Sequence, residues 1–106
     1  MNLSKKDLEI FSIVLRKPGM FLINRVEDYY MFFQGYTFNN KQELHIFINE
    51  KFSLFVGEKV KIDGHQNNWH RTIRYSSSTD SHSLELFSKL FIEFMRQYYS
   101  DFPFEK

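Results

Sequence analysis

Histidines are the residues of this chain best suited to hold a metal ion or move a proton. They are His45, His65, His70 and His82. His45 has no second histidine four residues along the chain, so the helical zinc-binding pattern is missing. His65 and His70 lie close together near Asp63, and these three side chains could hold a metal ion. A solvated polar loop explains them better, and we expect no metal site.

Carboxylates and nucleophiles give no stronger indication of catalysis. Glu27 and Asp28 are adjacent, and neighbouring residues on a helix point about 100° apart, so the two groups do not face one substrate. The run 76–79 is rich in hydroxyl groups but lacks the glycines of a nucleophile elbow. No glycine-rich phosphate loop is present either. We therefore expect a protein that is not an enzyme and that needs no cofactor.

The segment from Trp69 to Tyr75 interleaves arginines with aromatic residues. Trp69 could stack on a base while Arg71 and Arg74 contact phosphates. The whole chain, however, has 14 basic and 13 acidic side chains and a net charge of +1, without the basic excess typical of nucleic-acid binders. We favour a helix with Trp69 and Ile73 facing inward, and a small nucleic-acid-binding or regulatory module stays as the alternative.

Aromatic residues make up 19% of the chain, which is more than a small core readily hides. Two tyrosine pairs are informative, Tyr29 with Tyr30 and Tyr98 with Tyr99. Because adjacent helical residues point in different directions, we expect one tyrosine of each pair in the core and the other near its rim. Rim tyrosines are typical anchors of protein–protein interfaces. A broad aromatic core that takes up both tyrosines remains an equal alternative.

Length and composition indicate one domain that spans residues 1–106. The chain has no cysteine, which excludes disulfides and cysteine-ligated zinc and suits a reducing compartment. It has no 18-residue apolar run and no signal peptide at its N-terminus. We therefore expect a cytoplasmic protein with no membrane partner. Its oligomeric state is left open, because a subunit that buries its aromatics by association would look the same.

Helical periodicity and capping signals predict an all-α fold. Three apparent capping boxes occupy Ser4–Asp7, Asn24–Glu27 and Asn40–Glu43. The helices expected to follow are Lys5–Arg16, Arg25–Tyr36 and Lys41–Val56, with Gly57 ending the third. A last helix is expected after Ser81 or Ser83, and its buried stripe carries several phenylalanines. Together these elements make four main helices in one compact bundle.

The segment between the third and last helices has two interpretations. Val60 and Ile62 alternate with lysines, and Thr72, Ile73 and Tyr75 could pair with them in a small β-hairpin over residues 60–75. The spacing of Trp69 and Ile73 instead favours a short helix capped by Asn67 or Asn68. We prefer the short helix, and the hairpin remains the main alternative.

The turn after the first helix contains the sequence Arg16-Lys17-Pro18-Gly19-Met20-Phe21-Leu22. Pro18 and Gly19 must break a helix, because proline lacks an N–H and glycine tolerates positive φ. Three apolar residues follow the break directly. We expect Met20, Phe21 and Leu22 to anchor this turn in the core.

Several of these motifs occur in the same order in a known family. The matching segments are LRKPGMFL, FFQGYTF, LHIFINEKFSLFV, NNWHRTIRYSS and ELFSKLFIEF. This order resembles a family of small bacterial proteins, many of them immunity proteins encoded beside secreted or contact-delivered toxins. The matching residues that we expect to be structural are Arg16, Pro18, Gly19, Met20, Gly35, Tyr36, Trp69 and Ile73.

The resemblance implies an immunity protein of the contact-dependent growth inhibition type. Such a protein neutralises the C-terminal domain of a cognate toxin by stoichiometric binding. We expect the contact face on the second helix and the segment from Gly64 to Arg74, where aromatic surplus meets mixed charge. The candidate partner-binding residues are Glu27, Asp28, Tyr30, His65, His70, Arg71 and Arg74. For a nuclease toxin, Glu27 and Asp28 would supply a local acidic patch.

Overall fold

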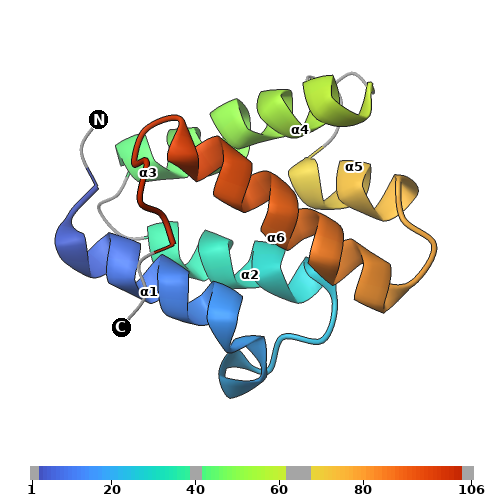
Figure 1. Ribbon diagram of the computed structural model, residues 1–106, viewed down its shortest axis with the longest axis horizontal. Helices are drawn as coiled ribbons and strands as arrows, with labels where there is room; N and C mark the ends of the chain where they lie inside the picture. The colour runs from blue at the N-terminus through green and yellow to red at the C-terminus, as the bar shows by residue number, and fades with distance from the viewer. Residues whose placement is uncertain (1–2, 39–41, 62–67, 104–106) are drawn as a thin grey trace.

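The computed structural model describes residues 3–38, 42–61 and 68–103, and every secondary-structure element among these residues is a helix (Figure 1). The elements are α1 (Lys5–Arg16), the 3₁₀ turn η1 (Pro18–Phe21), α2 (Val26–Thr37), α3 (Gln42–Ile46), the π turn η2 (Phe47–Lys51), α4 (Phe52–Val60), α5 (Trp69–Tyr75) and α6 (Asp80–Arg96). The prediction of an all-α fold is confirmed. No helix of these described residues is long and apolar enough to cross a membrane.

The core is a cluster of aromatic rings contributed by α1, α2, α4, α5 and α6. Helix α6 crosses the bundle in front of α2, with α1 below it and α4 above it in the view of Figure 1. Phe52 of α4 lies at the centre, with its ring centroid 5.3 Å from that of Trp69 and 5.3 Å from that of Phe91. Phe33 of α2 also contacts Trp69 and Phe91, at 6.3 and 5.2 Å. The Phe52–Phe91 and Phe33–Trp69 contacts are edge-to-face and the other two are tilted, and contacts of both kinds fix ring orientations as well as burying area.

Helix α1 begins and ends where the sequence predicts. The Ser4 hydroxyl accepts a hydrogen bond from the Asp7 amide at 3.1 Å, and the Asp7 carboxylate accepts one from the Ser4 amide at 3.2 Å. The other oxygen of Asp7 accepts the Tyr36 hydroxyl at 2.5 Å. Burial, followed by this bond to a carboxylate, raises the pKa of Tyr36. The cap of α1 is therefore joined to the C-terminal part of α2.

Two predicted helix caps are wrong by a few residues. At α2 the Asp28 carboxylate, rather than that of Glu27, accepts the amides of Asn24 and Arg25, at 2.9 and 3.1 Å. At α6 the cap is Thr79, whose hydroxyl accepts the His82 amide at 3.0 Å, so the predicted Ser81 and Ser83 lie inside the helix. Several polar residues stand before each helix, and the pattern alone does not select one of them.

The predicted helix Lys41–Val56 is divided and longer than expected. A π turn separates α3 from α4, and Gly57 is buried inside α4 instead of ending it. Helix α4 ends at Val60, and its C-cap residue Lys61 takes a left-handed conformation with φ 62°. The π turn contains Phe47 and Ile48, and both of these consecutive residues are buried in the core. The capping box predicted at Asn40 includes residues that lie outside the described ones.

The predicted hairpin is not found at the described positions. Val60 belongs to α4, while Thr72, Ile73 and Tyr75 belong to α5. Ile62 lies outside the described residues. Helix α5 follows Asn68 as N-cap residue, and the Trp69 amide donates to the Ser53 hydroxyl at 3.1 Å. The segment is a helix and not a strand because a helix buries Trp69 and Ile73 on one face, and this burial outweighs the short alternating pattern.

The turn after α1 contradicts the expectation of a buried anchor. Met20 is 70% exposed and Leu22 is 82% exposed, and of the predicted three only Phe21 is partly buried, with its ring 5.5 Å from Phe32. Ile23, at 4% exposure, takes the place in the core instead. The chain reverses at the left-handed Leu22, which caps the 3₁₀ turn, and the Ile23 amide then donates back to the Pro18 carbonyl at 3.1 Å.

Leu22 closes this turn with φ 59° and ψ 35°, a left-handed conformation that glycine adopts more easily. Among the described residues no glycine has positive φ, so Gly19 does not play that part. We predict that Leu22→Gly raises the free energy of unfolding by about 0.5–1 kcal/mol, because the exposed side chain contributes little packing. Urea denaturation measures the change.

Met31→Gly is the matched control, since Met31 is 67% exposed but lies within α2. There the same change should lower the free energy of unfolding by about 1 kcal/mol. A loss of stability in both variants would contradict the interpretation of Leu22.

Candidate functional site

Most candidate contact residues come together where α5 packs against α2. Trp69, Thr72 and Ile73 point into the core, so His70, Arg71 and Arg74 occupy the outer side of α5. From α2, Glu27 and Tyr30 reach the same region. We name this surface the α2–α5 face, and it consists of Glu27, Tyr30, His70, Arg71, Arg74 and Asp80.

Arg74 joins three helices through two carboxylates. Its Nε and one terminal nitrogen donate to the two oxygens of Glu27 at 3.0 and 2.7 Å. The same terminal nitrogen donates to Asp80, in the first turn of α6, at 2.8 Å. Hydrogen bonding from Arg74 holds the pKa of the Glu27 carboxyl at about 2, well below its ordinary value. Two-point binding of this kind fixes the guanidinium plane.

An aromatic pair lies beside this ion network. The rings of Tyr30 and His70 are 3.8 Å apart between centroids and tilted by 31°, and Tyr30 also meets the edge of Trp69 at 5.4 Å. The Nδ1 atom of His70 is buried and has no hydrogen-bond partner among the described residues. Burial lowers the pKa of His70, the positive charge of Arg71 adds to this effect, and Glu27 opposes it.

Arg71 is the exposed cation of the α2–α5 face. It forms no ion pair with another described residue, whereas Arg74 already has two. The face thus combines a fixed arginine, a half-buried tyrosine–histidine stack and an arginine whose charge is open to solvent. These are the residue types that most often anchor protein–protein interfaces.

The other two nominated residues are Asp28 and His65. Asp28 is engaged by the backbone at the start of α2, and His65 lies outside the described residues. The sequence pattern does not indicate Asp80 as a member of the face. It is six residues from Arg74, and the loop between them carries no pattern that predicts their contact.

The tyrosine pair on α2 divides as expected. Tyr29 is buried, its hydroxyl donates to the Val14 carbonyl at 3.2 Å, and burial raises its pKa to about 12. Tyr30 lies at the rim. On the C-terminal pair, Tyr98 is 49% exposed and Tyr99 is half-buried, with its hydroxyl accepting the Leu3 amide at 2.7 Å.

The nucleic-acid alternative loses two of its three residues. Trp69 has no exposed surface, so its indole cannot stack on a base, and Arg74 is neutralised by Glu27 and Asp80. Among the described residues, no cluster of three or more histidine, aspartate or glutamate side chains could hold a metal ion. His45 instead approaches Thr37 and Asn49, each at 3.1 Å from Nδ1.

Of the eight residues expected to be structural, some are buried and others are exposed. Trp69 and Ile73 are buried, Tyr36 is half-buried, and Pro18 is half-buried at the start of η1. Four of them are exposed instead, namely Arg16, Gly19, Met20 and Gly35.

Comparison of the chain with protein-family models, curated proteins and solved structures gives no match.

We predict that Glu27→Gln lowers the free energy of unfolding at neutral pH by about 1 kcal/mol, because Arg74 loses its two-point charged partner. The folded-state pKa of Glu27 lies below its ordinary value, so this stabilisation is present above pH 4.5 and is lost as pH falls toward about 2. Urea denaturation across that range should show the two proteins converging.

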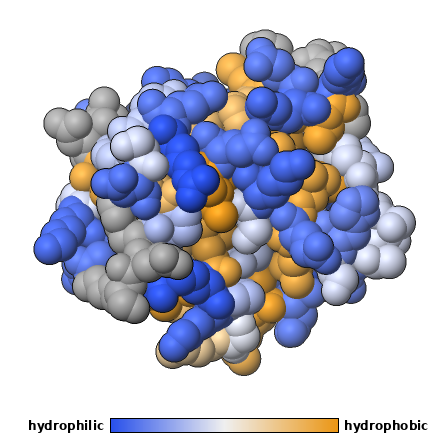
Figure 2. Space-filling view, viewed as in Figure 1, coloured by the Kyte–Doolittle hydropathy of each residue, from blue (hydrophilic) through white to orange (hydrophobic). Residues whose placement is uncertain are grey.

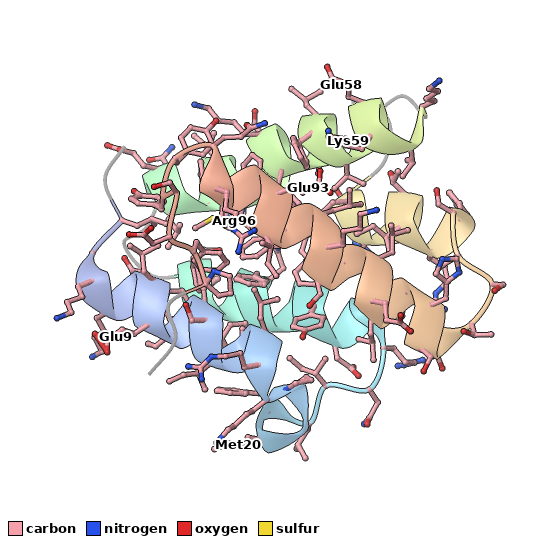
Figure 3. All side chains as sticks on the ribbon, in the orientation of Figure 1. Glu9, Met20, Glu58, Lys59, Glu93 and Arg96 are labelled. Carbon is pink, nitrogen blue, oxygen red and sulfur yellow. The ribbon has the colours of Figure 1, made fainter. Side chains whose placement is uncertain are left out.

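Glu93→Gln is the matched control, because Glu93 is about as exposed as Glu27 but meets Lys59 through one longer contact of 3.5 Å (Figure 3). Its effect should stay below about 0.5 kcal/mol. Equal losses in the two variants would contradict a special role of the Glu27–Arg74 pair.

We also predict a pH effect from His70. Its pKa is lowered in the folded state, so the unfolded chain takes up the proton first and the native state loses stability as pH falls below about 6.5. His70→Phe keeps a ring against Tyr30 and should remove this part of the loss. Thermal unfolding between neutral pH and pH about 5 measures it, with exposed His82→Gln as the control for losing a histidine. An unchanged pH dependence in His70→Phe would refute the prediction.

Proposed function

We propose that this chain is a bacterial immunity protein that acts in the cytoplasm and neutralises a cognate toxin by stoichiometric binding through the α2–α5 face. The sequence resemblance motivates the class of protein. The architecture we propose for this role counts α3, η2 and α4 as one bent helix, which gives four main helices and the short α5.

One observation supports the α2–α5 face as the binding surface. Four residues nominated from the sequence form two contacts between α2 and α5. Arg74 donates to Glu27 at 3.0 and 2.7 Å, and the ring centroids of Tyr30 and His70 are 3.8 Å apart, while Arg71 is exposed on the same helix α5. Because Arg74 and the Tyr30–His70 stack are already held in place, a partner that binds them loses less side-chain freedom. This pre-organisation favours tight binding over a small area.

The charges of the face bear on the kind of toxin. A phosphate-mimicking inhibitor of a nuclease needs carboxylates that are free to meet basic residues. Here Glu27 is occupied by Arg74, and Asp28 by the backbone amides. We therefore propose that a nuclease partner would be held away from its active site, with Arg71 facing an acidic group of the toxin.

The test is co-expression of the tagged chain with the C-terminal domain of the protein encoded immediately upstream. Rescue of growth together with a one-to-one complex on gel filtration would support the proposal. A toxic neighbour that is neither neutralised nor bound would refute it, as would the absence of any toxic neighbour.

Within such a complex, we predict that Arg71→Ala weakens binding at least about tenfold, as expected for an anchor whose loss costs about 1.4 kcal/mol or more. Isothermal titration calorimetry measures the affinity. Lys89→Ala, at an exposed position of α6, is the matched control and should leave affinity unchanged. Unchanged affinity in both variants would move the contact away from the α2–α5 face.

A further inference from the structure

The η1 turn projects from the end of the bundle and carries two exposed aliphatic side chains. We call Met20 and Leu22 the η1 knob, and they are 70% and 82% exposed. Figure 3 shows Met20 at the outer edge of the molecule, and Figure 2 shows hydrophobic colour at that same edge. Phe21, between them, is instead turned toward Phe32.

Leu22 combines two unfavourable features in one residue. Its backbone lies in the left-handed region at φ 59°, and its side chain exposes apolar surface to water. Glycine or asparagine at this position would relieve the backbone strain and would expose less apolar surface. Nothing within the described part of the fold uses the leucine side chain. Strain without an internal benefit points to a role in contact with something else.

The chain around the knob is positively charged although the protein as a whole is nearly neutral. From residue 16 to residue 26 there are three cations, Arg16, Lys17 and Arg25, and no carboxylate. These three residues are exposed and form no ion pair with another described residue. The next carboxylates along the chain are engaged elsewhere, Glu27 chiefly by Arg74 and Asp28 by backbone amides.

We propose that the η1 knob docks on an anionic lipid bilayer, with Met20 and Leu22 entering the interfacial region and the three cations resting on headgroups. Apolar side chains within a basic collar match the two properties of such a surface, an apolar interior and a negative boundary. This proposal departs from the sequence-based expectation of no membrane partner, and it does not depend on the proposed immunity function.

Two other occupants fit less well. A second copy of the chain would bring two sets of cations together, and like charges repel. A protein pocket would have to match the convex shape formed by the Met20 and Leu22 side chains. Tight protein interfaces are anchored more often by tryptophan, tyrosine and arginine. A fluid bilayer needs no such shape match.

The experiment is sedimentation of the full chain with lipid vesicles. One preparation is pure phosphatidylcholine, and the other contains about a third phosphatidylglycerol, enough to give a negative surface potential. We expect binding to the anionic vesicles alone, weakening as salt is added. Each of Arg16→Gln and Lys17→Gln should lower the partition coefficient about fivefold.

Variants of the knob separate docking from folding. Leu22→Gly is expected to be more stable than the parent protein yet to bind anionic vesicles about tenfold more weakly, since the buried apolar area is lost. Met20→Ser should act in the same direction. Leu54→Ser is the matched control, because Leu54 is 42% exposed on α4, away from η1, and should leave vesicle binding unchanged.

Several outcomes would overturn the proposal. These are no partition to anionic vesicles, equal partition to both preparations, or binding that survives Leu22→Gly and Met20→Ser. Loss of toxin binding in Leu22→Gly without any vesicle binding by the parent would also overturn it, and would assign the knob to a protein partner.

Discussion

Burial of Trp69 is the contact on which the arrangement of the α2–α5 face depends. Helix α5 has seven residues, too few to be stable in isolation. Its indole is held among the rings of Phe33, Phe52 and Phe87, and its amide is bound by Ser53. Because Trp69 is fixed, the following turn of helix presents His70 to Tyr30 and Arg74 to Glu27. The polar surface is therefore positioned by an apolar contact beneath it.

The sequence predicts the helices well where an apolar stripe repeats over several turns. The first helix is correct at both ends, because its stripe and its Ser4–Asp7 box agree. Caps were misplaced where several suitable residues compete, as at Asp28 and Thr79. The π turn after Ile46 was not predicted, since local composition does not distinguish one extra residue in a helical turn from a regular one.

The sequence predicts which residues belong to the candidate site better than it predicts which of them contact one another. Mixed charge and aromatic surplus nominated Tyr30, Arg71 and Arg74, but the partner of Arg74 in α6 depends on how a loop folds. The η1 turn shows the opposite failure. Three apolar residues after a Pro-Gly pair suggest burial, but the turn and its left-handed cap at Leu22 leave Met20 and Leu22 exposed and Ile23 buried.

Trp69 is the one tryptophan of the sequence, and it lies at the junction of α5 with the core. Its indole nitrogen is buried without a hydrogen-bond partner among the described residues, and the His70 ring lies nearly perpendicular to the indole, with the ring centroids 6.1 Å apart. Excited indoles respond strongly to nearby polarity and to neighbouring imidazolium groups. The fluorescence of Trp69 therefore reports whether α5 is packed on the core, and no second tryptophan contributes to the signal.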